Sequence, residues 1–106
     1  MLEVILEDLK NQKEVRKNLI QMKELLKDEE TRKELSELSA GNSIFLEFLN
    51  DEDPKVRKNA ALILGMTGNQ EMLPALVQAY EKEKTLFVKS DYVKAMQKLD
   101  CTDYLT

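Results

Sequence analysis

Hydrophobic residues recur every three or four positions along most of this chain, which is the spacing of one face of an α-helix. The first stripe of this kind consists of Leu2, Ile5, Leu6 and Leu9. Further stripes cover residues 15–26, 44–49, 56–64, 73–80 and 86–99. Short polar segments separate the stripes, and only three glycines and two prolines occur among the 106 residues. The pattern therefore predicts an all-α fold of helices joined by short turns.

Two polar segments carry signals for the start of a helix. Asp53 precedes Pro54; an aspartate there accepts hydrogen bonds from the free amides of the first turn, and the first helical position does not use the amide that proline lacks. Asn11 and Glu14 have the spacing of a capping box, which predicts a helix that begins near Gln12.

One motif recurs three times and opens an apolar stripe each time. Its copies are Val15-Arg16-Lys17-Asn18, Val56-Arg57-Lys58-Asn59 and Val88-Lys89-Ser90-Asp91. Intervals of about 30 to 40 residues are typical of helical solenoids. We therefore predict a single repeat domain over residues 1–106, with about three stacked antiparallel helix pairs and one additional helix. The expected units are repeat 1 over about 2–27, an insertion over 28–42, repeat 2 over about 43–66, repeat 3 over about 69–99, and the start of a further repeat over 100–106.

Two of these units are unlike a regular repeat. The insertion has Leu35 and Leu38 as its only strong apolar anchors, so it is expected to form the weakest helix. Residues 100–106 match residues 68–74, and Tyr104 and Leu105 resemble the first core residues of another helix. A terminal solenoid repeat normally has a polar outer face. We therefore expect an N-terminal fragment of a longer protein, with an open carboxyl end that is able to self-associate.

The segment from Leu49 to Gly65, LNDEDPKVRKNAALILG, resembles the HEAT repeat. In that family a helix pair has a second helix that opens with Asp, often Pro, then Val-Arg and a pair of small residues. This chain departs from the pattern at Lys89, where the family favours Arg, and at Thr85, which has no acidic side chain. The resemblance implies a right-handed α-solenoid whose second helices line the concave side. It also implies binding of proteins or extended ligands, and some relatives bind nucleic acid or serve as accessory modules of enzymes.

Two interpretations of the repeated basic position remain open. Arg16, Arg57 and Lys89 should lie in a row, in which Arg57 pairs with Asp53 and with a neighbouring turn and so forms a structural ladder between repeats. The same residues, with Lys17, Lys55 and Lys58, would otherwise form a basic strip for phosphates or acidic partners. The net charge is −4, which disfavours nonspecific attraction of the whole chain to nucleic acid or to anionic membranes.

The composition disfavours catalysis by this segment. No histidine is present, so the sequence has no ordinary imidazole base, no Ser-His or Cys-His pair and no histidine-containing metal site. The run Asp51-Glu52-Asp53 lacks the alternating ligands and the glycine of a calcium loop, and the glycines form no phosphate-binding motif. We expect no catalytic residue, no cofactor and no metal.

The sequence also bears on the compartment. Cys101 is the single cysteine and cannot form an intrachain disulfide. The longest apolar run, Ala60 to Met66, is far shorter than the ~20 residues that cross a bilayer, and the first eight residues carry acid where a secretory signal carries base. These features predict a cytoplasmic location.

Two hypotheses about function follow from the repeats and the resemblance. The first is a non-catalytic protein-interaction or scaffold module that binds through the concave face of its second helices. Its candidate contact residues are Lys17, Lys55, Lys58, Asn59 and Lys89. The alternative is an N-terminal accessory module that positions the substrate of a larger enzyme, such as a nucleic-acid-modifying methyltransferase, with catalysis in a downstream domain. The sequence beyond Thr106 would discriminate between them.

Overall fold

The computed structural model describes residues 2–37, 41–67 and 70–104. These ranges contain seven α-helices, one short 3₁₀-helix and no strand, so the all-α prediction is confirmed. The elements are α1 (Leu2–Lys10), α2 (Val15–Leu25), α3 (Glu29–Glu37), α4 (Gly41–Phe48), α5 (Pro54–Thr67), η1 (Gln70–Met72), α6 (Leu73–Lys82) and α7 (Leu86–Tyr104).

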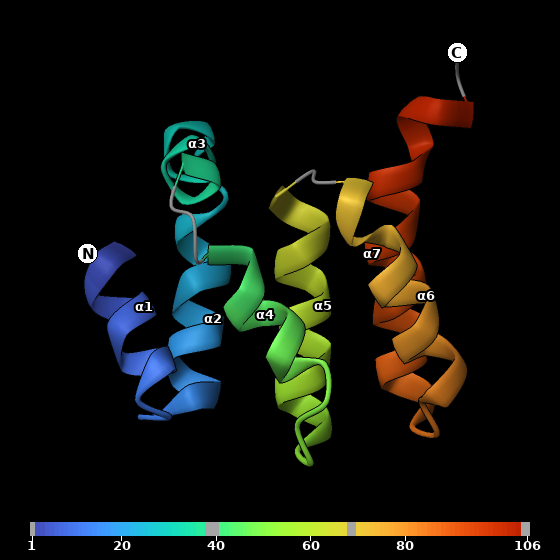
Figure 1. Cartoon of the computed structure of the whole chain (residues 1–106), viewed down its shortest axis with the longest axis horizontal. Coiled ribbons are helices and arrows are strands. Elements are labelled where there is room, and N and C mark those ends of the chain that lie inside the picture. Colours follow the sequence, from blue (N-terminus) through green and yellow to red (C-terminus); the bar gives the residue numbers. More distant parts are fainter. Residues whose placement is uncertain (1, 38–40, 68–69, 105–106) are drawn as a thin grey trace.

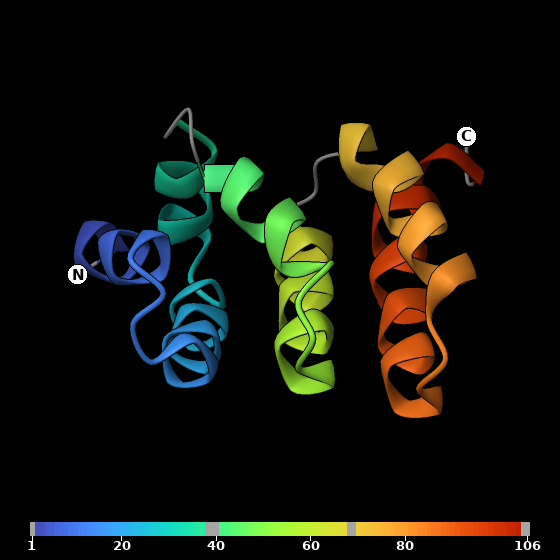
Figure 2. The ribbon, with the colours of Figure 1, turned by 60° about the horizontal axis from the view of Figure 1, so that its bottom comes forward.

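The helices form three pairs in a row, which are α1 with α2, α4 with α5, and α6 with α7 (Figure 1). The first helices of the pairs, α1, α4 and α6, lie in one layer, and the second helices, α2, α5 and α7, lie in the other (Figure 2). This arrangement is an α-solenoid of helix pairs, as the repeats predict. The molecule measures 35 × 32 × 20 Å along its principal axes.

Contact between the pairs is made chiefly by the second helices, because α5 packs against α2 on one side and against α7 on the other. The two helices α5 and α7 approach each other closely at Gly65 of α5. A Cβ atom at this position would lie 2.8 Å from the Cα atom of Ala95 in α7, so α5 and α7 meet where α5 has no side chain. Ala61 of α5 is fully buried, and its small side chain also allows a neighbouring helix to approach closely.

One apolar core runs through all three pairs, from Leu2 in α1 to Leu99 in α7. Its largest fully buried members include Leu9, Phe45 and Tyr92, one from each pair. Burying one such side chain contributes about 1.5–3 kcal/mol relative to leaving it exposed. Because each pair supplies one wall of its neighbour's core, the stack stabilises its members together.

The predicted insertion contains α3, which lies at one end of α2 (Figure 1). Leu35 holds this helix in place, since its side chain is buried and α3 contacts both α4 and α5. Leu38, the other expected anchor, lies outside the described residues.

The capping box predicted at Asn11 and Glu14 does not form. α2 begins at Val15, and Glu14 before it has a left-handed backbone (φ 41°) and makes no capping hydrogen bond with its side chain. The backbone of Gln12 is also left-handed, with φ 58°. Two residues of this turn therefore adopt a conformation that is unfavourable for residues other than glycine. The buried Asn18 side chain stabilises this turn, because its Nδ2 donates to the carbonyl oxygen of Lys13 at 2.8 Å.

The last helix differs from its expected length. α7 continues to Tyr104, so the boundary expected after Leu99 is not a helix end. The side chains of residues 100–104, Cys101 and Tyr104 among them, and residues 105–106 lie outside the described part of the chain. The further repeat expected over 100–106 therefore stays a prediction.

Candidate functional site

The start of α5 has the predicted arrangement. Pro54 is the first residue of the helix, and Oδ1 of Asp53 accepts a hydrogen bond from the amide of Lys55 at 2.9 Å. The other oxygen of Asp53 accepts from Nε of Arg16, which belongs to the preceding repeat. This bond from Arg16 lowers the pKa of Asp53, against an opposing effect of burial. One carboxylate therefore caps its own helix and joins repeat 2 to repeat 1.

Arg57 makes the corresponding contact one repeat further along. Its Nε and Nη2 donate to the two carboxylate oxygens of Glu83, at 2.8 and 2.9 Å. Its Nη1 donates to the carbonyl oxygens of Asp51 and Glu52, at 2.8 and 3.0 Å, and so secures the turn before α5. The side chain of Glu83 is only 3% exposed and that of Arg57 is 18% exposed. This bidentate contact connects repeat 2 to the turn between α6 and α7 in repeat 3.

Glu83 stays ionised although it is buried. Burial raises the pKa of its carboxyl group, but the donors from Arg57 and from the amide of Thr85, which lies 3.1 Å away, outweigh burial and leave the pKa below its ordinary value. Tyr92 is buried beside this pair. Burial, followed by the nearby Glu83 charge, raises the pKa of Tyr92 to about 12.

The ladder therefore connects neighbouring repeats. The sequence predicts that Arg57 pairs with Asp53 and with a neighbouring turn. In the structure Asp53 binds Arg16, and Arg57 binds Glu83 in the turn between α6 and α7. The sequence analysis missed Glu83. Its signal is its place in the repeat, because Glu83 precedes Lys89 by the same number of residues as Asp51 precedes Arg57. Each of the two carboxylates accepts a hydrogen bond from the amide two residues later.

Lys89 does not continue this ladder in the same way. Its Nζ lies 4.9 Å from the centre of the Tyr80 ring in α6, so it makes a cation–π contact with the first helix of its own pair. The Arg16, Arg57 and Lys89 positions correspond in the sequence. Within the described residues, the first two reach a carboxylate of the following repeat and Lys89 does not.

α3 begins with the same arginine geometry as α5. Nη1 of Arg32 donates to the carbonyl oxygens of Leu26 and Lys27, which lie six and five residues before it, at 2.8 and 3.2 Å. Asp28 stands four residues before Arg32, as Asp53 does before Arg57, and its carboxylate accepts from the amide of Thr31 at 3.2 Å. The expected insertion therefore opens like the second helix of a repeat.

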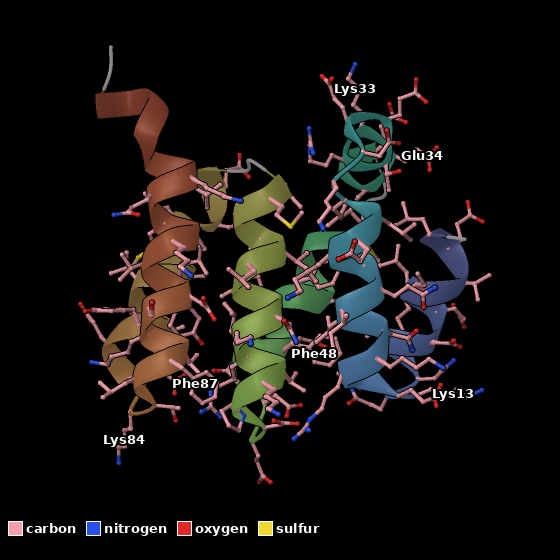
Figure 3. All side chains as sticks on the ribbon, turned by 180° about the vertical axis from the view of Figure 1, so that it is seen from behind. Lys13, Lys33, Glu34, Phe48, Lys84 and Phe87 are labelled. Atoms are coloured by element: carbon pink, nitrogen blue, oxygen red, sulfur yellow. The ribbon has the colours of Figure 1, made fainter. Side chains whose placement is uncertain are left out.

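We refer to the surface formed by α2, α5 and α7 as the second-helix face, which is turned toward the viewer in Figure 3. Lys17 and Lys55 are exposed, and Lys17 lies 3.8 Å from Glu14. Asn59 is only 3% exposed, so it cannot contact a partner as expected. The helix turns by about 100° per residue, which carries Asn59 from the side of Lys58 into the core. Its Oδ1 has no hydrogen-bond partner among the described residues.

The predicted residue Lys58 lies on the second-helix face beside residues that the sequence patterns did not reveal. Lys58 is half-buried, and its Nζ lies 5.8 Å from the centre of the Phe87 ring, which is 46% exposed. Burial lowers the pKa of Lys23 in α2, and the charge of Lys58 lowers it further, whereas Asp91 in α7 raises it. The charges of Lys58 and Asp91, which come from repeats 2 and 3, therefore act on Lys23 of repeat 1. Lys58 and Asp91 belong to the repeated motif, but Lys23 and Phe87 do not, so the motif does not reveal the whole cluster.

A cleft of about 370 Å³ lies between the α4–α5 turn and α6. A smaller hollow of about 240 Å³ adjoins it and shares four of its residues, Leu49, Asn50, Ala79 and Lys82. Asp51 and Glu52 line the larger cleft from the turn, and Lys82 and Lys84 line it from the end of α6. Its charges are mixed and indicate no particular ligand.

The described residues contain neither a metal site nor a helix that could span a membrane. Within residues 2–37, 41–67 and 70–104, no group of three or more His, Cys, Asp or Glu residues has the arrangement of a metal site. None of the helices in that part of the chain combines the length and the apolar composition needed to span a bilayer.

Comparisons with known proteins agree with this architecture. A family model described as HEAT repeats matches residues 2–97, which is most of the chain and includes all three helix pairs. The comparison with curated proteins gives no match, and the comparison with solved structures gives none either.

Proposed function

Because the chain belongs to the HEAT repeat family, we propose that it is a non-catalytic protein-interaction module that binds its partner through the second-helix face. HEAT repeats generally act as scaffolds for protein interactions. The observation that carries the proposal is that α2, α5 and α7 together present exposed apolar side chains beside lysines that have no carboxylate partner. Such a surface exists only when the three pairs are stacked.

The apolar part of this face consists of Ile20 on α2, which is 51% exposed, and Phe87 on α7, which is 46% exposed. Scattered exposed apolar residues are common on any protein. Here Phe87 lies 5.8 Å from Nζ of Lys58 in α5. Neither Lys58 nor Lys55 of the same helix lies within ion-pair distance of a carboxylate in the part of the chain that the structure describes. Large apolar side chains beside unpaired charges favour recognition of another protein.

A matched pair of photocrosslinking positions tests this function. Benzoylphenylalanine replaces Ile20 on the second-helix face or, as the control, Val4 on α1, which is 61% exposed in the opposite layer. In cells that express the chain naturally, we expect irradiation to give a protein adduct of defined mass at position 20 and none at position 4. Equal labelling at both positions, or no protein adduct at position 20, contradicts the proposal.

The lysines of the second-helix face also support a second candidate function. A module that positions a nucleic-acid substrate for a larger enzyme, such as a methyltransferase, would place phosphates near Lys23 and Lys58. Crosslinks from position 20 to RNA or DNA, together with a catalytic domain encoded beyond Thr106, would support this alternative.

A further inference from the structure

The charges and the aromatic ring of the second-helix face indicate what kind of partner segment fits it. We propose that the partner carries carboxylates beside a large apolar side chain, that the carboxylates bind Lys23 and Lys58, and that the apolar side chain packs on Phe87. This inference rests on the proposed function, because it assigns a chemistry to the partner of the same face.

Neither of the two lysines at this place forms an ion pair within the described residues. Lys94 lies 3.6 Å from a carboxylate oxygen of Asp91, and Lys27 lies 3.1 Å from one of Glu24, so the nearby carboxylates already have cationic partners. Lys23 and Lys58 have none within ion-pair distance in this part of the molecule. A carboxylate of the partner would therefore supply the ion-pair partner that Lys23 and Lys58 lack.

Lys23 and Lys58 are also close enough to disfavour each other. Lys23 is partly buried, and burial lowers its pKa most, followed by the charge of Lys58. A carboxylate placed between the two lysines relieves their repulsion. Because the lysines are already partly desolvated, the new contacts are stronger than those at a fully hydrated surface.

Phe87 supplies the apolar part of the site. Its ring is 46% exposed and lies 5.8 Å from Nζ of Lys58, so an apolar side chain on the ring lies next to a bound carboxylate. Figure 3 shows Phe87 between α7 and α5, whereas Lys13 and Lys84 point outward at the edges of the molecule. The spacing favours a segment in which acidic and apolar residues are neighbours.

A protein segment fits these observations better than nucleic acid does. Binding of single strands usually relies on several aromatic side chains that stack on bases. The whole chain has no Trp and only three Phe and three Tyr residues, so few side chains are available to stack on bases. A short acidic segment needs only the two lysines and one ring.

Fluorescence anisotropy with defined probes tests the proposal. The main probe is a fluorescein-labelled nonapeptide of glutamates with one central leucine, and the comparison probes replace leucine by serine, replace glutamates by lysines, or are a nine-nucleotide single-stranded RNA. All titrations are made at low ionic strength, where charged contacts are strongest. We expect the acidic leucine peptide to bind most tightly.

Variants of the chain locate the binding. Lys23→Gln combined with Lys58→Gln should weaken binding of the acidic leucine peptide about tenfold or more, because two charge contacts are lost. Phe87→Ala should reduce its affinity to about that of the serine peptide. The matched control, Lys13→Gln with Lys84→Gln, removes the same charge at the edges of the molecule and should leave affinity within about twofold. Circular dichroism checks that all variants remain helical.

Several outcomes would overturn the inference. One is that the lysine peptide or the RNA binds more tightly than the acidic leucine peptide. Others are that the leucine and serine peptides bind equally well, or that Lys13→Gln with Lys84→Gln weakens binding as much as Lys23→Gln with Lys58→Gln. If the acidic peptide fails but position 20 still crosslinks to a protein, the face binds proteins and only the assigned chemistry is wrong. If both experiments fail, the proposed function fails as well.

Discussion

At the scale of single residues, equivalent positions in two repeats make contacts of different strength. Arg16 and Arg57 both reach a carboxylate of the following repeat. The side chain of Arg16 is 57% exposed, whereas that of Arg57 is 18% exposed and its partner Glu83 is almost completely buried. Water competes with the first pair and screens it, but it hardly reaches Glu83. The second pair should therefore contribute more to stability.

Replacing Arg57 by alanine should lower the free energy of unfolding by about 2–3 kcal/mol, because the change leaves the buried carboxylate of Glu83 unpaired. The value lies below that for a fully enclosed pair, since an edge of the guanidinium group still reaches solvent. Urea denaturation measures the effect. Arg16→Ala is the matched control and should leave stability nearly unchanged. A larger loss in the control would refute this assignment.

Acid should weaken the same contact. The pKa of Glu83 is lower in the folded chain than its ordinary value of 4.5, so the folded state binds this proton less readily than the unfolded state does. The stabilisation is complete above that ordinary value and is lost as the pH falls through the lower folded pKa. Urea midpoints measured from pH 6 to pH 3 should fall less steeply in Glu83→Gln than in the unaltered chain. Parallel curves would contradict the prediction.

At the scale of helices, the contact between α5 and α7 depends on Gly65. An alanine in the middle of a helix is usually better than glycine by about 1 kcal/mol. Here the added Cβ would lie 2.8 Å from the Cα of Ala95, so one backbone has to move. Overpacking of this kind costs about 1–3 kcal/mol and should exceed the gain in helix propensity.

We therefore expect Gly65→Ala to be destabilised slightly and Gly65→Val by about 3 kcal/mol, at the upper end of the overpacking range. Thermal unfolding followed by circular dichroism gives both values. Ser90→Ala, at an exposed position on α7, serves as the neutral control. An increase in stability for Gly65→Ala would show that the helices are not in close contact at this point.

The sequence predicts helices well where local signals agree with packing. Asp53 and Pro54 mark the start of α5 because both act within one turn. The predicted start of α2 is wrong. Asn11 and Glu14 have the spacing of a capping box, but the backbone of Glu14 is left-handed and its side chain makes no capping hydrogen bond. That turn is held by Asn18, whose contribution depends on its burial against the rest of the stack. Local spacing does not contain this information.

At the scale of the whole molecule, the repeats should lose protection from hydrogen exchange unequally. In a stack, each repeat contacts only its neighbours. Arg57→Ala should therefore speed amide exchange around the α6–α7 turn and the start of α7 more than in α1 and α2. Mass spectrometry of proteolytic fragments measures this difference under native conditions. A uniform increase along the chain would indicate one cooperative unit instead.

The second-helix face is a property of the stack, and the sequence predicts only part of it. Lys58 was placed there from the repeated motif, whereas Asn59 of the same motif is buried. Lys23 and Phe87 lie outside the motif, and they join Lys58 only because α2 and α7 pack on either side of α5. The position of an exposed cluster depends on the rotation between helices, which hydrophobic spacing alone does not determine.

The central claim is that successive helix pairs pack through their second helices. Nuclear Overhauser spectroscopy tests it at one point of contact, the α protons of Gly65 and the methyl group of Ala95. A Cβ at position 65 would lie 2.9 Å from that methyl carbon. The account predicts a strong cross-peak between them in the folded chain at neutral pH. Its absence, with both resonances assigned and the chain helical, would contradict the stacked arrangement.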